Sequence, residues 1–298
     1  MKILHVVSGL EDKGNGIAIA AKLIAGEQKA DLVEARLFAC GKCNLSQYDE
    51  VWVHSAWLLA VLVSCFRVIC SGRRLVRMSH ANYDPVRLTY HGWKKRLVGP
   101  IERFCLRRCA MIVATCEAEK GWIEAYLGRR CPPVEVTDIK RFFKLPNSDE
   151  GNLPSDRPLH LLYLGRRHPL KGLESLGAAL RELQDKDISV NFRVVSSAFG
   201  EELKKAWDWC DVLVLPTLSE NFGLVIAEAL ERGKRVITTD GAPAWGVGLT
   251  GLTGFSGLYS GYEGRLVYLK GYRDGTPQER VRLLKSAIAS LVSGLMSK

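Results

Sequence analysis

The sequence predicts an α/β protein built from two Rossmann-like, doubly wound domains that face a cleft, and three observations support this. Short runs rich in β-branched residues alternate with amphipathic stretches, which is typical of βαβ units on a parallel sheet. The alternation restarts in the second half of the chain. Between the halves, Leu145–Pro158 is dense in proline and polar residues and is the best linker candidate. We therefore expect a first domain over residues 1–147 and a second over residues 158–298.

The first half carries the predicted elements of the first domain. Its strands are Lys2–Val7, Leu32–Phe38, Glu50–His54, Leu75–Ser79 and Met111–Thr115, and its helices cover about 16–27, 57–70, 93–109 and 117–127. The longest apolar stretch, Val51–Phe66, spans about 16 residues and falls short of the roughly 20 that cross a bilayer. A buried helix after a strand explains this stretch better.

The second half repeats the pattern. Its strands are Leu159–Leu164, Val190–Val195, Asp211–Leu215 and Arg235–Thr238, and its helices cover about 172–184, 200–209 and 223–232. The glycine-rich stretch Gly241–Gly275 is expected to be irregular. A last helix, over about 277–296, follows Thr276-Pro277, and its packing back on the first domain is one arrangement to consider. The predicted second domain is shorter than is usual for a Rossmann-like domain.

Composition narrows the class of protein. The chain has 298 residues, 47% of them hydrophobic and 25% charged, which excludes a disordered, collagen-like or small disulfide-rich protein. Of the net charge of +10, most lies between Arg67 and Arg108, where eleven Lys and Arg face only Asp84 and Glu102. Such a patch suits nucleic acid, an anionic membrane or an acidic substrate.

The chain shows no export or metal signature. Its first ten residues are typical of a strand rather than a signal peptide, so we expect a cytoplasmic chain with nine reduced cysteines. Cys40 and Cys43 form the one CxxC and lack a second metal-ligand pair. Asp185-Lys-Asp187, the only DxD, lies in a charged helix end. We expect neither a metal nor a cofactor.

A glycine loop lies between the first strand and the first helix. Gly14-Asn-Gly16 is not a dinucleotide fingerprint, because the third glycine would fall on Ile19. The free N–H groups of the following helix start would suit a phosphate or sugar oxygen. A plain turn is the alternative.

Two cations follow the first strand of the second domain. Arg166 and Lys171 flank a helix start after Gly165, an arrangement that suits a multiply charged anion such as a diphosphate. A solvated basic loop is the alternative.

The segment Asp211–Leu230 is the most specific in the chain. A buried strand ends at Pro216, a short loop carries Glu220, and a helix begins near Gly223. Glu228 interrupts the apolar face of that helix, so its carboxylate needs a partner such as a pair of hydroxyl groups.

The order of these motifs resembles the retaining glycosyltransferases of family 4, which have the two-domain GT-B fold. The motifs that carry the resemblance are Gly165-Arg-x4-Lys-Gly172 and Pro216-x3-Glu220-Asn-Phe-Gly-x4-Glu228-Ala. In the first half, Ser79–Pro85, Trp93–Arg96 and Ala114–Glu119 are similar to the bacterial lipopolysaccharide and polysaccharide branch.

The resemblance implies a role for each matching residue. Arg166 and Lys171 would bind the nucleotide diphosphate and stabilise it as the leaving group. Glu220 would contact the donor sugar, and Glu228 would hold the ribose hydroxyls. Ser196 would take the place of a βα unit that the family usually has and this chain lacks. The remaining donor contacts implied are His80 across the cleft, Gly14 and Gly16 in the glycine loop, and Asn221, Phe222, Gly223 and Leu224 around the second helix start.

The basic segment predicts an amphipathic helix. On a helical wheel Leu97, Val98, Ile101, Phe104 and Cys105 share one arc, and Arg96, Arg103 and Arg107 lie opposite. With Lys94 and Lys95, these arginines are expected to face an anionic membrane or a phosphorylated acceptor. An ordinary solvated face is the alternative.

The function expected is a metal-independent retaining hexosyltransferase that uses a UDP- or GDP-linked sugar and a lipid-linked or lipopolysaccharide-type glycan. The alternatives are a transferase with a soluble acceptor and a degenerate GT-B protein that binds a glycan or partner without turnover. We expect the chain to be peripheral on the inner face of the plasma membrane, and we expect no nucleic-acid partner.

Overall fold

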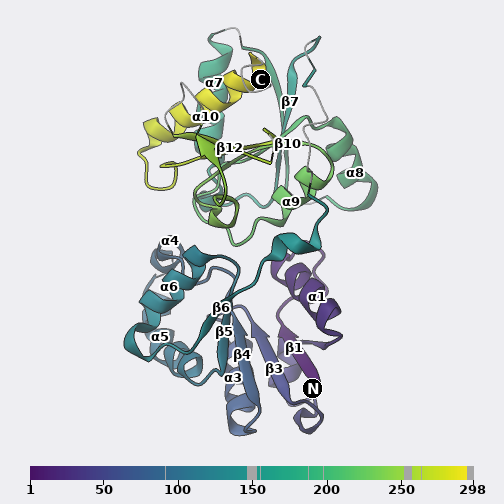
Figure 1. Ribbon diagram of the computed structural model, residues 1–298, viewed down its shortest axis with the longest axis vertical. Coiled ribbons are helices and arrows are strands. Elements are labelled where there is room, and N and C mark those ends of the chain that lie inside the picture. Colours follow the sequence, from purple (N-terminus) through teal and green to yellow (C-terminus); the bar gives the residue numbers. More distant parts are fainter. Residues whose placement is uncertain are drawn as a thin grey trace. The chain divides into compact units, whose positions relative to one another are not determined.

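The chain divides into two compact units, Met1–Phe142 and Phe143–Lys298, each of which can be followed by colour and label in the ribbon (Figure 1). The computed structural model describes the chain except for residues 91, 146–152, 155, 187, 197, 252–256, 263 and 294–298. The predicted linker therefore lies largely outside the described residues. We describe each unit by itself, as the first and the second domain.

The first domain is built on a parallel sheet. In spatial order its strands are β2 (Asp31–Glu34), β1 (Ile3–Val7), β3 (Glu50–His54), β4 (Arg74–Met78), β5 (Met111–Ala114) and β6 (Val134–Val136). Its helices are α1 (Gly16–Gln28), α2 (Ala35–Ala39), α3 (Leu59–Cys70), α4 (Pro85–Thr89), α5 (Gly92–Arg107) and α6 (Glu117–Leu127).

The two faces of this sheet are covered differently. Successive side chains on a strand point to opposite faces. Leu4 and Val6 belong to the main core, to which α2, α3, α5 and α6 also contribute. Val7 points the other way and packs against Ala18 and Ala21 of α1, which lies across the sheet from α5 (Figure 1). The α1 face is the one that carries the histidines described below.

The second domain has a mixed sheet of its own. In spatial order its strands are β11 (Thr250–Gly251), β12 (Leu258–Gly261), β13 (Leu266–Leu269), β10 (Arg235–Thr239), β9 (Val212–Leu215), β7 (Leu159–Leu164) and β8 (Val190–Val195). Among the described strands of this sheet, the pairs that involve β12 are antiparallel and the others are parallel. Its helices are α7 (Leu173–Gln184), α8 (Gly200–Trp209), α9 (Leu224–Glu231) and α10 (Pro277–Val292).

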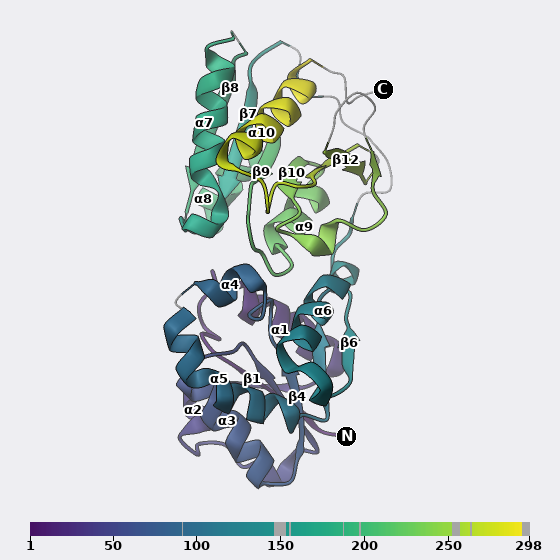
Figure 2. The ribbon, with the colours of Figure 1, turned by 90° about the vertical axis from the view of Figure 1, so that its left-hand side faces the viewer.

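Helices cover both faces of the second sheet. The core beneath α7 and α10 includes Leu161, Val214, Val267 and Leu284, and α8 and α9 lie on the other side (Figure 1). Both views place α10 beside α7 of its own domain (Figures 1 and 2). A capping box starts α10, since Thr276 and Glu279 exchange side-chain-to-backbone hydrogen bonds. Its packing back on the first domain stays a prediction.

Two predicted segments have a different structure. The strand expected over Leu32–Phe38 ends at Glu34 and continues as α2, because Ala35 and Phe38 are buried with helical spacing. The stretch Gly241–Gly275, expected to be irregular, contains β12 and β13. All four residues of β13 are buried, and the strand pairs in parallel with β10.

The two-domain α/β prediction is confirmed. Parallel strands with helices on both faces recur in each unit, as the repeated sequence pattern predicts.

Candidate donor site

The predicted site residues of the second domain gather at one edge of its sheet. The loops after β7, β9 and β10 all leave the carboxyl ends of neighbouring parallel strands. Ligands of doubly wound sheets bind at this edge. We refer to these three loops, with the start of α9, as the donor edge.

Lys171 and Glu220 meet directly at the donor edge. Lys171 closes the short 3-10 turn Pro169–Lys171 after β7, and its Nζ forms an ion pair with Glu220 Oε2 from the loop after β9. Each side chain is 18% exposed, so solvent or a ligand can still reach the pair. These residues lie 49 positions apart in the chain, and the sequence predicts that both belong to one site. In the structure their side chains are in contact.

Glycines allow the backbones of the donor-edge loops to pack closely against each other. Gly172 has a φ of +68°, and a Cβ there would lie 1.9 Å from the Pro216 carbonyl oxygen. A Cβ at Gly241 would lie 2.1 Å from the Thr217 carbonyl oxygen. The Leu218 N–H donates to the Leu170 carbonyl, 2.8 Å away. Only glycine permits these close approaches between the backbones.

The start of α9 is fixed by aromatic packing. Phe222 is buried against Trp245, with ring centroids 5.1 Å apart, and the Trp245 Nε1–H donates to the Phe222 carbonyl. Gly223 has a φ of +73° and caps the helix, so that Leu224 is its first residue. Because the first N–H groups of a helix lack partners within it, this start can bind a phosphate oxygen.

Glu220 is held at the entrance to α9. Its backbone N–H donates to the Gly241 carbonyl, 2.7 Å away, and its Oε1 accepts a hydrogen bond from the Asn221 N–H, 3.2 Å away. Asn221, Phe222, Gly223 and Leu224 therefore follow Glu220 at the helix start, as the motif predicts.

Glu228 lies further along α9 and is half-buried. Burial raises its pKa above the ordinary value; the positive charge of Arg232 opposes this shift and Glu231 adds to it. Within the described part of the chain, its carboxylate makes no hydrogen bond. A half-buried carboxylate of this kind suits a pair of donated hydroxyl groups.

Arg166 and Ser196 lie at the same edge and are exposed. The Arg166 carbonyl accepts a hydrogen bond from the Tyr163 hydroxyl, 2.8 Å away, which ties the loop to β7. Burial, helped by the Glu220 charge, raises the pKa of Tyr163, so this hydroxyl stays protonated as a donor. Ser196 follows β8, the strand beside β7.

The glycine loop of the first domain precedes α1. The Gly14 N–H donates to the Asp12 carboxylate, 2.9 Å away. Asn15 caps α1 by accepting from the Ile17 N–H, and its Nδ2 donates to the Ser8 carbonyl, 2.7 Å away. Gly16 is the first residue of the helix. The loop is therefore ordered by Asn15, a role that the glycine pattern does not reveal.

His80 follows β4 and is buried, with a φ of +55°, and Ala81 has a φ of +57°. Two successive non-glycine residues in the left-handed region are strained. The Glu119 carboxylate holds this turn: it accepts from the Ser79 hydroxyl at 2.7 Å, the Ala81 N–H, and both the N–H and the hydroxyl of Thr115. Sequence reasoning quoted Glu119 only as part of a motif and missed this role.

The prediction that the apolar arc of α5 faces the core is partly wrong. The residues buried on α5 are Gly99, Glu102, Cys105 and Leu106, whereas Leu97 is 71%, Ile101 45% and Phe104 41% exposed. Glu102 faces inward because its carboxylate pairs with the buried Arg77 of β4, 2.8 Å away. Leu97, Ile101 and Phe104 therefore point to solvent, whereas Cys105 is buried and Val98 packs against the core, as predicted.

The five predicted surface cations differ in their exposure. Lys94, Arg96 and Arg107 are exposed. Lys95 and Arg103 are half-buried: Lys95 Nζ donates to the Arg87 carbonyl, and the Arg103 guanidinium lies over the Tyr126 ring, 4.2 Å from its centroid. These two are structural contacts of the first domain, and Arg107, although exposed, also donates to the Leu127 carbonyl, 3.1 Å away.

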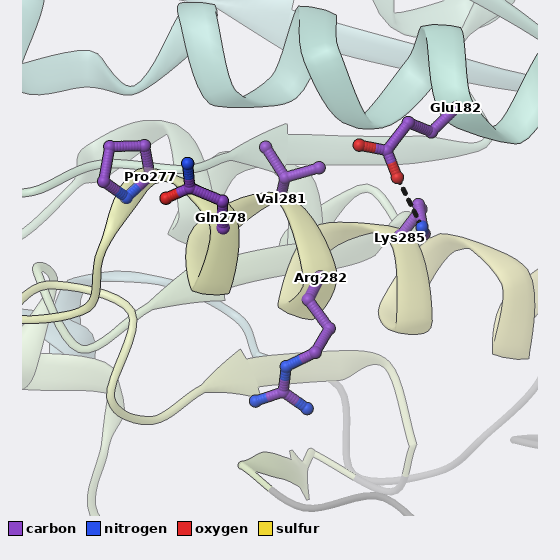
Figure 3. A pocket seen from close by; sticks show the side chains of 6 residues that line it. All are labelled: Glu182, Pro277, Gln278, Val281, Arg282 and Lys285. Atoms are coloured by element: carbon purple, nitrogen blue, oxygen red, sulfur yellow. Dashed lines mark hydrogen bonds and ion pairs between the residues drawn. The ribbon is translucent and has the colours of Figure 1, made fainter.

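Other features lie apart from the donor edge. A cavity of about 340 Å³ between α7 and α10 is lined by Glu182, Gln278, Val281 and Lys285, among others, with Glu182 paired to Lys285 (Figure 3). None of its lining residues is a predicted site residue. Among the described residues, no His, Cys, Asp and Glu side chains form a metal-binding group, and no helix has the length and apolar character to span a bilayer.

The second domain matches a known family. Residues 158–254 match the family described as glycosyl transferases group 1. No curated protein sequence is significantly similar to this chain.

Solved structures share the fold of the whole chain. Sucrose-phosphate synthase from Thermosynechococcus elongatus is 13% identical, with a TM-score of 0.65 over 98% of this chain and 90% of that one. HepE of Anabaena, solved with UDP-glucose, is 16% identical, with a TM-score of 0.59 over 100% and 94%. The lipopolysaccharide outer core galactosyltransferase WaaB is 16% identical, with a TM-score of 0.56 over 99% and 91%. The second domain therefore contains a region that matches the glycosyl transferases group 1 family, and the likeness to these structures shows that the chain has the two-domain GT-B fold.

Proposed function

We propose that the chain is a metal-independent, retaining hexosyltransferase that moves a sugar from a UDP- or GDP-linked donor to a lipid-linked or lipopolysaccharide-type glycan. The observation that carries this proposal is the Lys171–Glu220 ion pair, held between two interlocked loops at the donor edge. A cation and a carboxylate fixed beside a helix start suit the two tasks in binding a nucleotide-sugar donor, which are to stabilise the leaving diphosphate and to recognise the sugar.

The first need is charge on the leaving group. As the bond from the sugar to the diphosphate breaks, negative charge develops on the phosphate oxygens. Arg166, Lys171 and the N–H groups at the start of α9 can stabilise that charge, and fixed cations of this kind replace the electrostatic role of a metal.

The second need is recognition of the sugar. Without ligand, Lys171 and Glu220 neutralise each other. A diphosphate that takes over the Lys171 ammonium frees the Glu220 carboxylate to accept hydrogen bonds from sugar hydroxyls. Glu228, whose half-buried carboxylate makes no hydrogen bond within the described part of the chain, is then the group for the ribose hydroxyls.

The finer parts of the proposal are supported by resemblance. The retaining outcome follows the family 4 motifs. The donor class follows the likeness to HepE, which was solved with UDP-glucose, and the acceptor class follows the likeness to WaaB.

The test is transfer from defined donors. UDP- and GDP-hexoses are incubated with the wild-type chain and lipopolysaccharide core acceptors, nucleotide release is measured, and the anomeric configuration of the product is read by NMR. Lys171→Met and Glu220→Gln should each lower kcat by about 10²–10³-fold with the fold intact. Lys285→Met, which removes the Glu182 ion pair of α10, is the matched control and should keep wild-type activity.

Several outcomes would contradict the proposal. Near-wild-type activity of Lys171→Met or Glu220→Gln would show that the site lies elsewhere. An inverted product would refute the retaining mechanism, and transfer only to soluble sugars would refute the acceptor class.

We also propose that the first domain binds the inner face of the plasma membrane through α5. Trp93, Leu97, Ile101 and Phe104 recur at helical spacing and are all exposed, Trp93 by 64%. We call these four residues the α5 stripe. A contiguous exposed apolar stripe on a protein surface often marks an interaction surface.

Cations border the α5 stripe. Lys94 Nζ lies 5.5 Å from the Trp93 ring centroid, and the Arg108 guanidinium lies 5.0 Å from that of Phe104. Arg96 and Arg107 are exposed on the same helix. Rings that enter the interface beside cations favour anionic lipid, where each cation contributes about 1 kcal/mol.

Sedimentation with liposomes tests this surface. Leu97→Gln combined with Trp93→Ser should weaken binding to anionic vesicles at least tenfold, and raised salt should weaken wild-type binding. Val247→Gln, at a 72% exposed apolar position of the second domain, is the control. Equal binding to neutral and anionic vesicles, or unchanged binding of the double variant, would refute the membrane proposal.

A further inference from the structure

A groove lined by cations lies in the second domain, between α8 and the turn that joins α9 to β10. Its volume is about 400 Å³. The α8 side is one face of that helix, since its lining residues recur at helical spacing, and the turn supplies two cations. The lining residues include Leu203, Lys204, Trp207 and Asp208 of α8, with Arg232 and Lys234 of the turn. We call this hollow the α8 groove.

The α8 groove is separate from the donor edge. Arg232 and Lys234 come directly before β10, at the amino end of that strand. The loops of the donor edge leave the carboxyl ends of β7, β9 and β10, which run parallel. No predicted site residue lines the groove. A ligand in it would therefore occupy a different site from the nucleotide sugar.

The charges of the groove are positive and unpaired. Lys204, Arg232 and Lys234 face one carboxylate, that of Asp208, so the lining has a net charge of +2. Within the described residues, none of these four side chains forms an ion pair. Lys204 and Arg232 are exposed and Lys234 is half-buried, so a ligand can reach all three cations.

One end of the groove is rigidly built. The Arg232 Nη1 donates to the Glu228 carbonyl, 2.8 Å away, and the guanidinium lies 5.1 Å from the centroid of the Trp207 ring. Trp207 is only 3% exposed. Its buried Nε1–H has no hydrogen-bond acceptor among the described residues, although buried donors are nearly always bonded. This end of the groove therefore has a fixed cation and calls for an acceptor atom.

The size and charge of the groove fit a small phosphorylated ligand. Pockets for small molecules have volumes of about 300–1,000 Å³. A phosphomonoester carries a charge of about −1.5 to −2 at pH 7 and has three acceptor oxygens, which match a lining of +2. Asp208 would repel a bare phosphate, but its carboxylate can accept hydrogen bonds from hydroxyl groups. A sugar that carries a phosphate satisfies both requirements.

We propose that the α8 groove binds a phosphorylated sugar, with its phosphomonoester against Lys204, Arg232 and Lys234 and its hydroxyl groups donating to Asp208. A free sugar phosphate and a phosphorylated residue of a glycan offer this same chemistry. The site does not rest on the proposed function, because no residue of the donor edge takes part in it.

Calorimetry of the full chain tests the binding. Lys171→Met is used as the background, because the donor edge also offers groups that bind phosphate. Glucose 6-phosphate should bind and glucose should not. Lys204→Met combined with Lys234→Met should weaken binding about tenfold or more, because each change removes a charge-assisted hydrogen bond. Lys205→Met, at an exposed neighbour on α8 that does not line the groove, is the matched control and should keep the affinity.

Inorganic phosphate tests the sugar contact. We expect it to bind about tenfold more weakly than glucose 6-phosphate, because it cannot use Asp208 as an acceptor. Asp208→Ala removes both the repulsion and the acceptor. The variant should bind inorganic phosphate more tightly than the wild type does and should lose most of the preference for glucose 6-phosphate.

NMR of the tryptophan indole groups locates the ligand. With ¹⁵N-labelled tryptophan, Trp207→Phe and Trp245→Phe assign two signals by their loss. Glucose 6-phosphate should shift the Trp207 signal in the Lys171→Met chain, with the same midpoint as in calorimetry. A shift of the Trp245 signal alone would place the phosphate at the donor edge and overturn the proposal. If Trp207→Phe fails to fold, the loss of affinity in the double lysine variant decides instead.

Two further ligands distinguish the sources. Lipopolysaccharide core oligosaccharide is compared before and after phosphatase treatment. Tighter binding than glucose 6-phosphate, lost after phosphatase, identifies a glycan ligand, and weaker binding identifies a free sugar phosphate.

The remaining outcomes overturn the proposal or one part of it. Absence of binding by every phosphorylated sugar, or unchanged affinity of the folded double lysine variant, overturns the site. Equal affinity for inorganic phosphate and glucose 6-phosphate overturns the sugar contact. A wild-type chain that transfers no sugar would refute the proposed function, and the binding measurements would still decide whether the α8 groove is a site.

Discussion

The two domains position their polar groups in opposite ways. In the first domain the groups are buried and held by other side chains. Examples are the Arg77–Glu102 pair, the Glu119 carboxylate that binds Ser79, and the hydrogen-bonded row of His5, His54 and His80, which we call the histidine row. In the second domain the paired side chains are partly exposed, and the backbone holds them through glycines that permit close loop contacts. The first domain should therefore respond to changes of charge and proton, and the second to changes of backbone shape.

Acidification should give the largest difference in stability between the two domains. Since the pKa values of His5, His54 and His80 are lowered in the folded state, the unfolded chain binds protons that the folded chain does not once pH falls below about 6.5. Between pH 6.5 and 5 this costs about 1.5 kcal/mol for each histidine, or about 5 kcal/mol in all.

Urea unfolding at each pH, followed by pulsed hydrogen exchange and mass spectrometry, reports each domain separately. Peptides of β1, β3 and β4 should lose protection at much lower urea in acid than peptides of β7 and β9. If acid lowered the urea concentration of unfolding equally in both domains, the expected difference between the domains would be refuted.

The buried ion pair gives the next largest effect. Arg77→Met leaves the Glu102 carboxylate buried without its cation and should destabilise the first domain by about 3–5 kcal/mol. Adding Glu102→Gln removes the unpaired charge, keeps an acceptor for the Tyr83 hydroxyl and should recover most of the loss. The same unfolding experiment measures both variants. If the double variant is no more stable than Arg77→Met, charge is not the cause.

The second domain should show a smaller effect of backbone shape. Gly223→Ala places a Cβ at a φ of +73°, 3.0 Å from Ile226 Cδ1 and 3.3 Å from Glu220 Cγ. The left-handed conformation alone costs about 1–2 kcal/mol. Gly177→Ala, on α7, places a Cβ in ordinary contact with Arg181 Nη1, 3.7 Å away, and should instead stabilise the domain by about 0.5–1 kcal/mol. Thermal unfolding compares the two alanines, and equal effects would argue against a special role for Gly223.

Much of the fold follows from local pattern. The bounds predicted for β3, β7 and β8 match the structure, because short runs rich in aliphatic and aromatic residues have polar or turn-forming residues on either side. The short strand β6 escaped prediction, as did β13, where Leu266–Leu269 lies in a glycine-rich stretch. Three or four residues carry too little periodicity to reveal a strand.

The donor edge was also predictable in outline, since Lys171 and Glu220 lie in spaced motifs after apolar strands, and the structure joins them. Two other features could not be predicted from the sequence. The exposed side of α5 depends on the pairing of Glu102 with a residue 25 positions earlier. The histidine row depends on strand register, which brings together three residues that have no common motif.

The contact of Gly172 with Pro216 has a consequence for how this enzyme can change. The loops that carry Lys171 and Glu220 form one mechanical unit, so a side chain added at Gly172 or Gly241 would displace both groups at once. A saturation library should therefore tolerate almost nothing at these two glycines. The loop after β8, on the edge strand of the sheet, does not share this constraint and should tolerate more substitutions.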